Sequence, residues 1–340
     1  MSKLINVCVI GTGRAGMIHA RSYNGSVPGA RLAALCDPFE AALAAAQKET
    51  GVEKGYTDYH DVMADPEIDA VVIVTPTGLH REITIAAAQA GKHVFCEKPM
   101  ATSAEECDEM IAACKEHGVK LQLGFMRRFD KSFRRGKEVI DSGAIGDVTL
   151  VKSLTHGPSE PKEWMFDVSK SSGPIGEVNS HDFDTLRWYA GSEVKTIHAI
   201  GRNFRSPEKA GEYPDYYDTC AVILEFENGV LGMVDGAQYV QYGYDARAEI
   251  LGTKGDVLVG SQNADTVSVA VAGMELQSAA MPTWRTLFKE AYVEEARAFV
   301  RCIVEDTEPE VTGHDGKMAL VLVRDGLRSL LEHRPIEVEA

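Results

Sequence analysis

A glycine-rich turn after an apolar run near the N-terminus constrains this chain most. The run Ile5–Ile10 breaks into the sequence GTGRAG at residues 11–16, a pattern typical of a strand that turns directly into a helix. In such a turn the first glycine permits the bend, the second lets backbone approach a pyrophosphate, and the third lets helix and strand pack closely. The helix N-terminus offers its N–H groups to the phosphates. The predicted dinucleotide contacts are Gly11, Thr12, Gly13, Arg14, Ala15 and Gly16.

An acidic residue at the end of the next strand-like run completes this fingerprint. A helix-length apolar segment, 18–27, precedes the run Arg31–Cys36, which ends at Asp37, roughly 20 residues beyond the last glycine. A carboxylate there accepts both hydroxyls of an adenosine ribose and repels a 2′-phosphate, and no Lys or Arg occurs in residues 38–41. NAD is therefore favoured over NADP. The position is also compatible with Asp37 as the N-cap of a helix over 38–50.

Length and charge narrow the class of protein. A chain of 340 residues with 44% apolar composition exceeds what one core usually holds, so two domains are expected. The net charge of −16 disfavours nucleic acid and anionic membrane surfaces as partners. No stretch approaches the length of a membrane-spanning helix. The seven cysteines are scattered without zinc or CxxC spacing, which predicts buried thiols in a reducing cytoplasm and no metal site.

Strands and helices alternate through the first third of the chain after Asp37. Apolar runs and amphipathic helical patterns follow one another at 70–75, 79–90, 93–96, 103–117 and 120–124. Short, fully apolar strands separated by helices indicate a parallel sheet that is covered on both faces. The fold class is thus α/β, with an N-terminal Rossmann domain expected over residues 1–125.

The pattern then changes to consecutive strands. After a helical segment at 130–142, β-branched and alternating stretches occur at 148–155, 194–204, 219–227, 230–239, 246–251 and 267–271. Asn228-Gly229, between two of them, is a strong signal for a tight hairpin. Helices at 287–304 and 315–332, with residues 313–315 as the cap between them, end the chain. The second domain, 126–340, is predicted to be α+β with an open, mostly antiparallel sheet, and its last helix has the option of packing back on the first domain.

The ends of the predicted parallel strands are candidate ligand sites. Ligands of open α/β sheets bind beyond the carboxyl ends of the strands, where Thr75-Pro76 ends one strand and Glu97-Lys98 another. The ammonium group of Lys98 would reach a nicotinamide crevice there. A solvated surface lysine is the alternative, and the residues alone favour it.

A second candidate is the stretch 177–188. His181 and Asp184 lie one helical turn apart on one face, after Asn179 or Ser180 as a helix cap. A histidine close to carboxylates suits general-base work on an alcohol. A capping region with a structural histidine explains the same residues and stays open at this point.

Seven ordered motifs together resemble a known family. They are the glycine turn with Ile18-His19-Ala20, Thr75-Pro76 with His80, Glu97-Lys98-Pro99, 124–130, 142–146, 181–188 and Asp315-Gly316. The set spans essentially the whole chain and is similar to the Gfo/Idh/MocA oxidoreductases, most of all to the inositol 2-dehydrogenases among them. The resemblance implies a Rossmann domain followed by an α/β domain whose open sheet carries the substrate side and commonly the subunit contacts.

The resemblance also implies an activity and residue roles. It implies NAD-dependent oxidation of a secondary hydroxyl of a cyclic polyol or sugar to a ketone, first of all myo-inositol to scyllo-inosose. Lys98 would hold the reacting oxygen, His181 would act as general base, and Glu177 would orient it. The implied substrate contacts are Asp184, His156, Arg127 and Tyr242 or Tyr244. The implied cofactor contacts outside the glycine turn are Asp37, Thr75, Pro76, His80, Glu97 and Lys98.

Two departures from the family pattern bear on the substrate. Glu177 stands where the inositol enzymes carry an aspartate, and Pro158 stands where an asparagine is expected. They leave open another sugar or aldose dehydrogenase of the same family. A non-catalytic NAD-binding sensor and an enzyme that recycles a tightly bound cofactor are further alternatives. Because an open sheet leaves an apolar face to cover, a homo-oligomer, dimer or tetramer, is expected through that sheet.

Overall fold

The chain divides into two compact units. The computed structural model describes residues 4–271, 273, 275 and 277–339. Unit 1 holds the chain up to Phe129 together with the returning segment Glu290–Leu320, and unit 2 holds Asp130–Lys289 and the chain from Val321 onwards. The division between the units thus falls after Phe129 rather than after residue 125, and part of the C-terminal segment belongs with unit 1.

Unit 1 is built on a parallel sheet. Its strand order is β3-β2-β1-β4-β5-β6, and every neighbouring pair is parallel. The strands are β1 Ile5–Ile10, β2 Ala30–Cys36, β3 Gly55–Tyr56, β4 Ala70–Ile73, β5 His93–Glu97 and β6 Leu121–Gly124. The helices are α1 Gly16–Tyr23, α2 Glu40–Thr50, α3 Tyr59–Ala64, α4 His80–Gln89, α5 Ala104–Glu116 and α11 Lys289–Val304. The predicted Rossmann sheet is confirmed.

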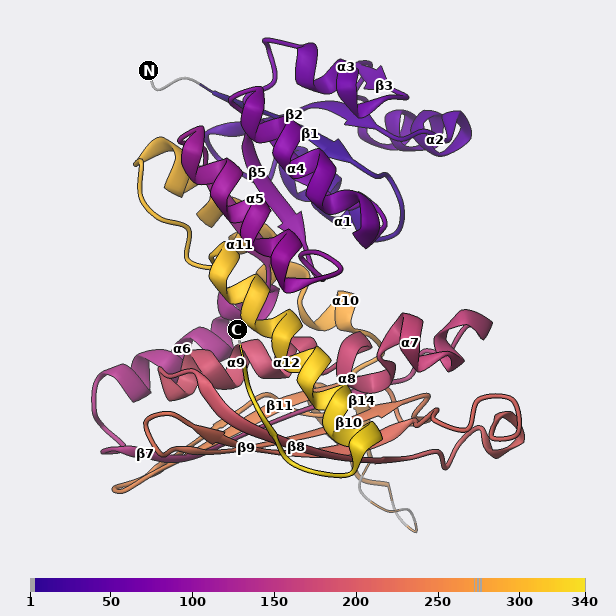
Figure 1. Ribbon diagram of the computed structural model, residues 1–340, viewed down its shortest axis with the longest axis vertical. Helices are drawn as coiled ribbons and strands as arrows, with labels where there is room; N and C mark the ends of the chain where they lie inside the picture. The colour runs from indigo at the N-terminus through magenta and orange to yellow at the C-terminus, as the bar shows by residue number, and fades with distance from the viewer. Residues whose placement is uncertain (1–3, 272, 274, 276, 340) are drawn as a thin grey trace. The chain divides into compact units, whose positions relative to one another are not determined.

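Alternate residues of the central strands supply two separate cores. In β1, Val7 and Val9 belong to one buried cluster, and Cys8 and Ile10 belong to another. This follows from the period of two along a strand, which sends successive side chains to opposite faces of the sheet. The Val7 cluster also contains Phe299 and other residues of α11, so the returning segment, the orange helix beside the indigo strands in Figure 1, completes the cover of that face.

Unit 2 is built on a mostly antiparallel sheet of seven strands. The order is β12-β11-β7-β10-β9-β8-β15, in which β7 and β10 are parallel and the other neighbours are antiparallel. The strands are β7 Val148–Gly157, β8 Val194–Arg202, β9 Thr219–Phe226, β10 Leu231–Gln238, β11 Asp245–Gly252, β12 Asp256–Val259 and β15 Ile336–Glu337. A further pair, β13 Asn263–Val269 and β14 Gln277–Ala280, stands apart from it.

The predicted hairpin at Asn228-Gly229 is confirmed. It joins β9 to β10, which pair in antiparallel register, and the N–H of Phe226 donates to the carbonyl of Val230 at 2.9 Å. Gly229 has φ +84°, a backbone conformation that glycine adopts without a steric cost. The turn therefore fixes which residues of β9 and β10 face each other.

The two faces of the unit 2 sheet differ in burial. In β9, Val222 and Leu224 are buried whereas Ile223 is exposed. Figure 1 shows helices along one face of this sheet. The helices of the unit are α6 Lys131–Asp141, α7 Val168–Ser171, α8 Gly173–Glu177, α9 Ser180–Ala190, α10 Trp284–Leu287 and the later part of α12 Gly313–Glu332. We call the face that carries Ile223 the open face.

Helix α12 begins two residues earlier than the sequence predicted. Thr312 and Asp315 bond reciprocally: the N–H of Asp315 donates to the Thr312 hydroxyl at 3.3 Å, and the Asp315 carboxylate accepts the N–H of Thr312 at 2.9 Å. Such a pair satisfies N–H groups at a helix start that have no partner within the helix. The cap is therefore Thr312 with Asp315, and Gly313 is already helical.

Candidate functional site

The glycine turn of unit 1 contains two glycines that the fold itself requires. Gly11 has φ +96°, and a Cβ there would lie 2.6 Å from the carbonyl oxygen of Val74. A Cβ on Gly16 would lie 1.8 Å from the carbonyl oxygen of Gly11. Gly13 differs, because it is exposed and a Cβ there would meet nothing within 4 Å. Packing within the protein therefore does not explain why residue 13 is a glycine. Close approach of a pyrophosphate to the backbone at this residue explains it.

Asp37 lies directly against this turn. Its Oδ2 accepts the N–H of Thr12 at 2.7 Å and the Thr12 hydroxyl at 2.8 Å, while its Oδ1 accepts the N–H of Phe39 at 3.0 Å. Helix α2 begins at Glu40, with Phe39 as its N-cap, so the alternative role of Asp37 as that N-cap is wrong. The carboxylate joins the ends of β1 and β2, where a dinucleotide fold holds the ribose.

His80 connects the loops that follow β4 and β5. Its Nε2 lies 2.9 Å from the carbonyl oxygen of Thr75, and its Nδ1 lies 2.9 Å from that of Pro99. Burial lowers the pKa of His80, and the hydrogen bonds to these carbonyls act in the opposite direction. The ring is buried between the two loops while Pro76 is exposed. His80 thus holds the loop backbones together, and direct contact of Thr75, Pro76 and His80 with the cofactor stays a prediction.

A buried histidine–glutamate pair supports Lys98. His19 of α1 has its Nε2 2.8 Å from Oε1 of Glu97, and Oε2 of Glu97 accepts the backbone N–H of Lys98 at 3.0 Å. A Cβ on Gly124 would lie 2.9 Å from this carboxylate, so the absence of a side chain there makes room for it. Glu97 therefore faces the protein, and its predicted cofactor contact stays a prediction. Lys98 itself is half-buried at the end of β5.

Arg127 lies in a single helical turn, Met126–Phe129, directly after β6. Its side chain is only 1% exposed. The next residue, Arg128, pairs with Asp315 at 2.8 Å. Both arginines are thus buried, and a substrate contact for Arg127 stays a prediction.

In unit 2 the structure brings Glu177, His181 and Asp184 onto two successive helices. Glu177 ends α8, and His181 and Asp184 lie in the first turns of α9, where both are buried. Asn179 occupies the N-cap position of α9, but its side chain makes no capping hydrogen bond. Its amide instead donates to Oδ2 of Asp182 at 2.8 Å. Of the two predicted caps, Asn179 or Ser180, Asn179 is thus the N-cap residue, although without a capping side-chain bond, and Ser180 is the first residue of the helix.

His156 and Tyr242 lie on the other face of the sheet. The neighbours Ser153 and Thr155 in β7 bond to Asp182 of α9, so His156, one residue on, points to the open face. Its ring contacts Tyr242 and Asp235 there. The structure does not bring His156 and Tyr242 together with His181, and their substrate role stays a prediction.

Tyr244 has a different environment from Tyr242. It is buried, its N–H donates to the carbonyl of Met281 at 2.7 Å, and its ring centre lies 6.4 Å from that of Phe288. The Phe288 ring in turn packs with Phe133 of α6. Of the two tyrosines, Tyr244 is thus the one near the helices of unit 2.

Two sets of contacts in the structure were not predicted from the sequence, although Glu97 itself was predicted as a cofactor contact. One is His19 with Glu97, and the other is Asp182 with Ser153 and Thr155. The second set could have been found in the sequence. Ser153 and Thr155 are two residues apart and so share one face of a strand, and two hydroxyl residues are unusual on a face that is otherwise buried. The first set carries no such signal, since His19 and Glu97 are far apart in sequence.

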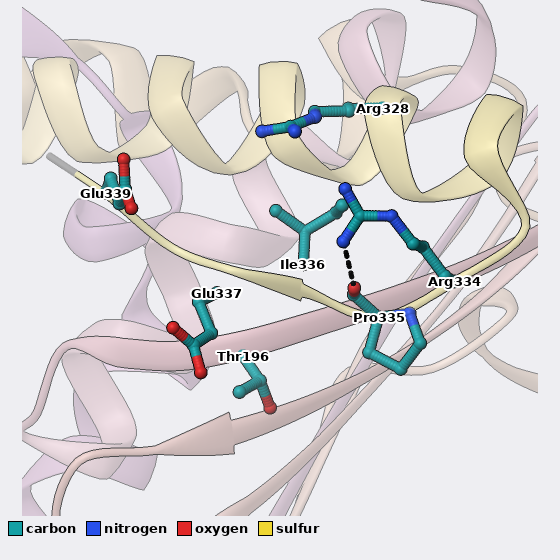
Figure 2. Close-up of a pocket in the computed structure, with 7 residues that line it drawn as sticks. All are labelled: Thr196, Arg328, Arg334, Pro335, Ile336, Glu337 and Glu339. Atoms are coloured by element: carbon teal, nitrogen blue, oxygen red, sulfur yellow. Dashed lines mark hydrogen bonds between the residues drawn. The ribbon is translucent and has the colours of Figure 1, made fainter.

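Other features do not add to these sites. Figure 2 shows a surface hollow of unit 2, and the predicted site residues are not among those lining it, which are Thr196, Arg328, Arg334, Pro335, Ile336, Glu337 and Glu339. Within the described residues, no cluster of three or more His, Cys, Asp or Glu side chains could hold a metal ion. None of the described helices has the length and apolar character that a membrane span needs.

The parallel sheet, the glycine turn and the Asp37 carboxylate define the class: a two-unit protein whose first unit is a dinucleotide-binding Rossmann fold. A family described as an oxidoreductase family with an NAD-binding Rossmann fold matches residues 5–125, and the GFO/IDH/MocA C-terminal domain matches residues 133–258. The chain belongs to the GFO/IDH/MocA family of oxidoreductases. The resemblance drawn from the seven motifs is confirmed, and so is NAD as the cofactor of this fold.

Similar proteins span the full chain. Myo-inositol 2-dehydrogenase of Thermotoga maritima is 36% identical and covers 98% of this chain and 99% of its own length. The NAD-dependent scyllo-inositol 2-dehydrogenase of Bacillus subtilis is 34% identical and covers 100% of this chain and 98% of its own length. Scyllo-inositol dehydrogenase of Lactobacillus casei, solved with NAD(H) and scyllo-inositol, superposes with a TM-score of 0.92 at 30% identity, over 99% and 100% of the two chains.

Proposed function

We propose that the protein is an NAD-dependent inositol 2-dehydrogenase that oxidises myo-inositol to 2-keto-myo-inositol (scyllo-inosose). The observation that carries this proposal is the full-length similarity to inositol dehydrogenases in a chain that keeps Lys98 and the His181–Asp184 pair. Unit 1 would serve as the NAD-binding domain, and unit 2 as the substrate-binding and oligomerisation domain. The glycine turn and Asp37 support the first assignment.

Each residue has a defined chemical task in this proposal. Bound NAD supplies the acceptor for the hydride that leaves the carbinol carbon. Lys98 holds the alcohol oxygen and stabilises the negative charge that develops on it, a role that contributes several kcal/mol when preorganised. His181 takes the hydroxyl proton, which typically contributes about 10²–10⁴-fold in rate, and Glu177 orients it. Asp184 accepts hydrogen bonds from further hydroxyls. The products are the ketone, NADH and a proton.

The first experiment measures nicotinamide reduction with NAD and NADP against myo-inositol, scyllo-inositol and common aldoses. Turnover with an inositol and NAD, and little with NADP, is expected. Lys98→Ala and His181→Ala should each lose turnover by about 10² or more with NAD binding intact. Lys115→Ala and His117→Ala, at exposed positions of unit 1, are matched controls. Near-normal turnover in the Lys98 or His181 variant would overturn the mechanism.

Scyllo-inositol is the second candidate substrate, favoured by the relatives that act on it or bind it. Myo- and scyllo-inositol differ in configuration at one carbon, so oxidation of that carbon yields the same ketone from either. The ratio of kcat/KM for the two substrates therefore decides between them, and the product does not. Glu177 and Pro158, which depart from the family pattern, make an aldose the third outcome of the panel.

We also propose that copies of the chain associate through the open face of the unit 2 sheet. Large apolar side chains are exposed there on neighbouring strands: Ile200, Ile223, Leu231, Met233, Leu251 and Leu258. An apolar surface of this kind is uncommon on a monomer. All seven cysteines are free and buried, which supports a reducing compartment, the cytoplasm, as the location.

A further inference from the structure

Helix α9 is anchored to the sheet of unit 2 through one buried carboxylate. Asp182 is fully buried, and its Oδ1 accepts the Ser153 hydroxyl at 2.5 Å while its Oδ2 accepts the Thr155 hydroxyl at 2.6 Å. The Asn179 amide donates to the same Oδ2 at 2.8 Å. Ser153 and Thr155 both lie in β7, two residues apart and on one face. The first turn of α9 is thus tied to β7 by hydrogen bonds at both carboxylate oxygens.

The strand next to β7 holds the N-cap residue from the other side. The Asn179 amide also lies 3.3 Å from the carbonyl oxygen of Asp235 in β10, and the Cys220 thiol lies 3.4 Å from the Asn179 Oδ1. A Cβ on Gly236 would lie 1.9 Å from that Oδ1, so β10 approaches the start of α9 as closely as a glycine permits. Three strands, β7, β10 and, through Cys220, β9, therefore fix the place where α9 begins.

This anchor determines the direction in which the other residues of the turn face. Successive residues of an α-helix are about 100° apart around its axis. His181 precedes Asp182, and Asp184 follows it by two residues, so a helix held at Asp182 cannot rotate without turning both away. The charge also lies in the first turn, where the helix dipole favours a carboxylate. General-base work depends on orientation, since a misplacement of about 1 Å can cost 10²-fold in rate.

We propose that Asp182, held by Ser153 and Thr155, is a positioning residue that sets the rotation of α9 and so aims His181 and Asp184 at the substrate. The inference rests on the proposed function, because it assumes that His181 is the base. It assigns to three buried residues a role in the reaction without contact to the substrate.

The test removes the two hydroxyls without changing the shape of the site. The variants are Ser153→Ala, Thr155→Val, their combination, and Thr155→Ser, which keeps the hydroxyl. Ser329→Ala is the matched control, because Ser329 is also fully buried and bonds a helix to the sheet, donating to the carbonyl of Arg334 at 2.6 Å and accepting the N–H of Ala199 at 3.0 Å. Each variant is assayed for kcat, for KM of myo-inositol, for NAD affinity and for its thermal midpoint.

The combined variant should lower kcat by about 10- to 100-fold and raise the KM for the polyol, since Asp184 turns with His181. NAD affinity of the combined variant should stay at the parental value. Thr155→Ser, which keeps the hydroxyl, should have the kcat of the parent. The pH profile of kcat/KM should keep its general-base limb with a lower plateau. Ser329→Ala should lower the thermal midpoint with kcat unchanged. Thr155→Val removes a single hydroxyl and carries the test if the combined variant does not fold.

Two results would overturn the inference. One is a kcat within about twofold of the parent in the combined variant, and the other is equal loss in Thr155→Val and Thr155→Ser. His181→Ala, assayed in parallel, separates this inference from the proposed function. If His181→Ala is inactive while the Ser153 and Thr155 variants are active, the positioning role alone is rejected. If His181→Ala is active, the proposed function is rejected.

Discussion

At the scale of single residues, the glycine turn predicts two different responses to the same substitution. Gly16→Ala places a Cβ 1.8 Å from the carbonyl oxygen of Gly11, an overlap that should cost about 1–3 kcal/mol or more of folding free energy. Gly13→Ala meets no neighbour within 4 Å, so it should fold like the parent. It should nevertheless weaken NAD binding by about tenfold or more, because its methyl group occupies the approach of the pyrophosphate.

Urea unfolding and NAD titration by fluorescence separate these effects. The expected pattern is lower stability for Gly16→Ala, and parental stability with weaker NAD binding for Gly13→Ala. Gly78→Ala is a control, because a Cβ on this exposed glycine also meets nothing within 4 Å. Parental NAD affinity in Gly13→Ala would show that the pyrophosphate does not approach the turn at this residue.

The residues of the turn could be predicted because the signal is local. Glycine spacing, an apolar strand before it and an acidic residue after the next strand all lie within a short stretch. The partners of those residues could not be predicted in the same way. The bonds of Asp37 to Thr12 and of Glu97 to His19 join positions that only the folded sheet brings together.

At the scale of elements, His93 links the starts of β5 and β6 and should make stability depend on pH. Its Nδ1 accepts the N–H of Lys120 at 3.1 Å, which requires that this nitrogen carry no proton. Burial lowers the pKa of His93, and the charge of Lys120 lowers it further. The unfolded chain, with a histidine pKa of about 6.5, therefore binds this proton more readily than the folded protein does.

The sign of the effect follows from proton linkage. As pH falls through about 6.5, the unfolded state gains a proton first, so the free energy of unfolding decreases until the folded pKa is reached. The lowered pKa of His80 acts in the same direction. His93→Asn keeps an acceptor for Lys120 but does not titrate, so its stability should fall less between about pH 7.5 and 5.5. His117→Asn, at an exposed position, should retain the parental slope in urea unfolding, whereas an unchanged slope in His93→Asn would contradict the prediction.

Long elements were predictable and short ones were not. The apolar strands of unit 1 and the hairpin at Asn228-Gly229 carry enough periodicity or turn chemistry to be found in the sequence. Strands β3 and β15 have two residues each and exist because a neighbouring strand pairs with them. Asn179 is a preferred capping residue, yet its amide serves Asp182, a competition that no local pattern reveals.

At the scale of the whole molecule, the two-part organisation was predictable but the path of the chain was not. A switch from alternating helices to consecutive strands locates the division near its observed place, Phe129. The return of Glu290–Leu320 to unit 1 was foreseen only as an option for the last helix, because the apolar stripe of α11 shows that the helix packs without showing on what. The face of the parallel sheet that would otherwise be uncovered decides where α11 packs. Phe299 of α11 joins the buried cluster of β1 on that face.

The open face of unit 2 leads to the last prediction. Ile223 and Met233 are directly paired across β9 and β10 and are 59% and 46% exposed. The double variant Ile223→Lys/Met233→Lys should dissociate the oligomer. Two positive charges buried in the interface are costly, and they repel each other across the paired strands. Sedimentation should show the mass fall to that of one chain. Val304→Lys, at a residue 50% exposed near the end of α11, should keep the parental mass. A parent that already sediments as one chain, or a double variant that keeps the mass of an oligomeric parent, would show that this face is not the interface.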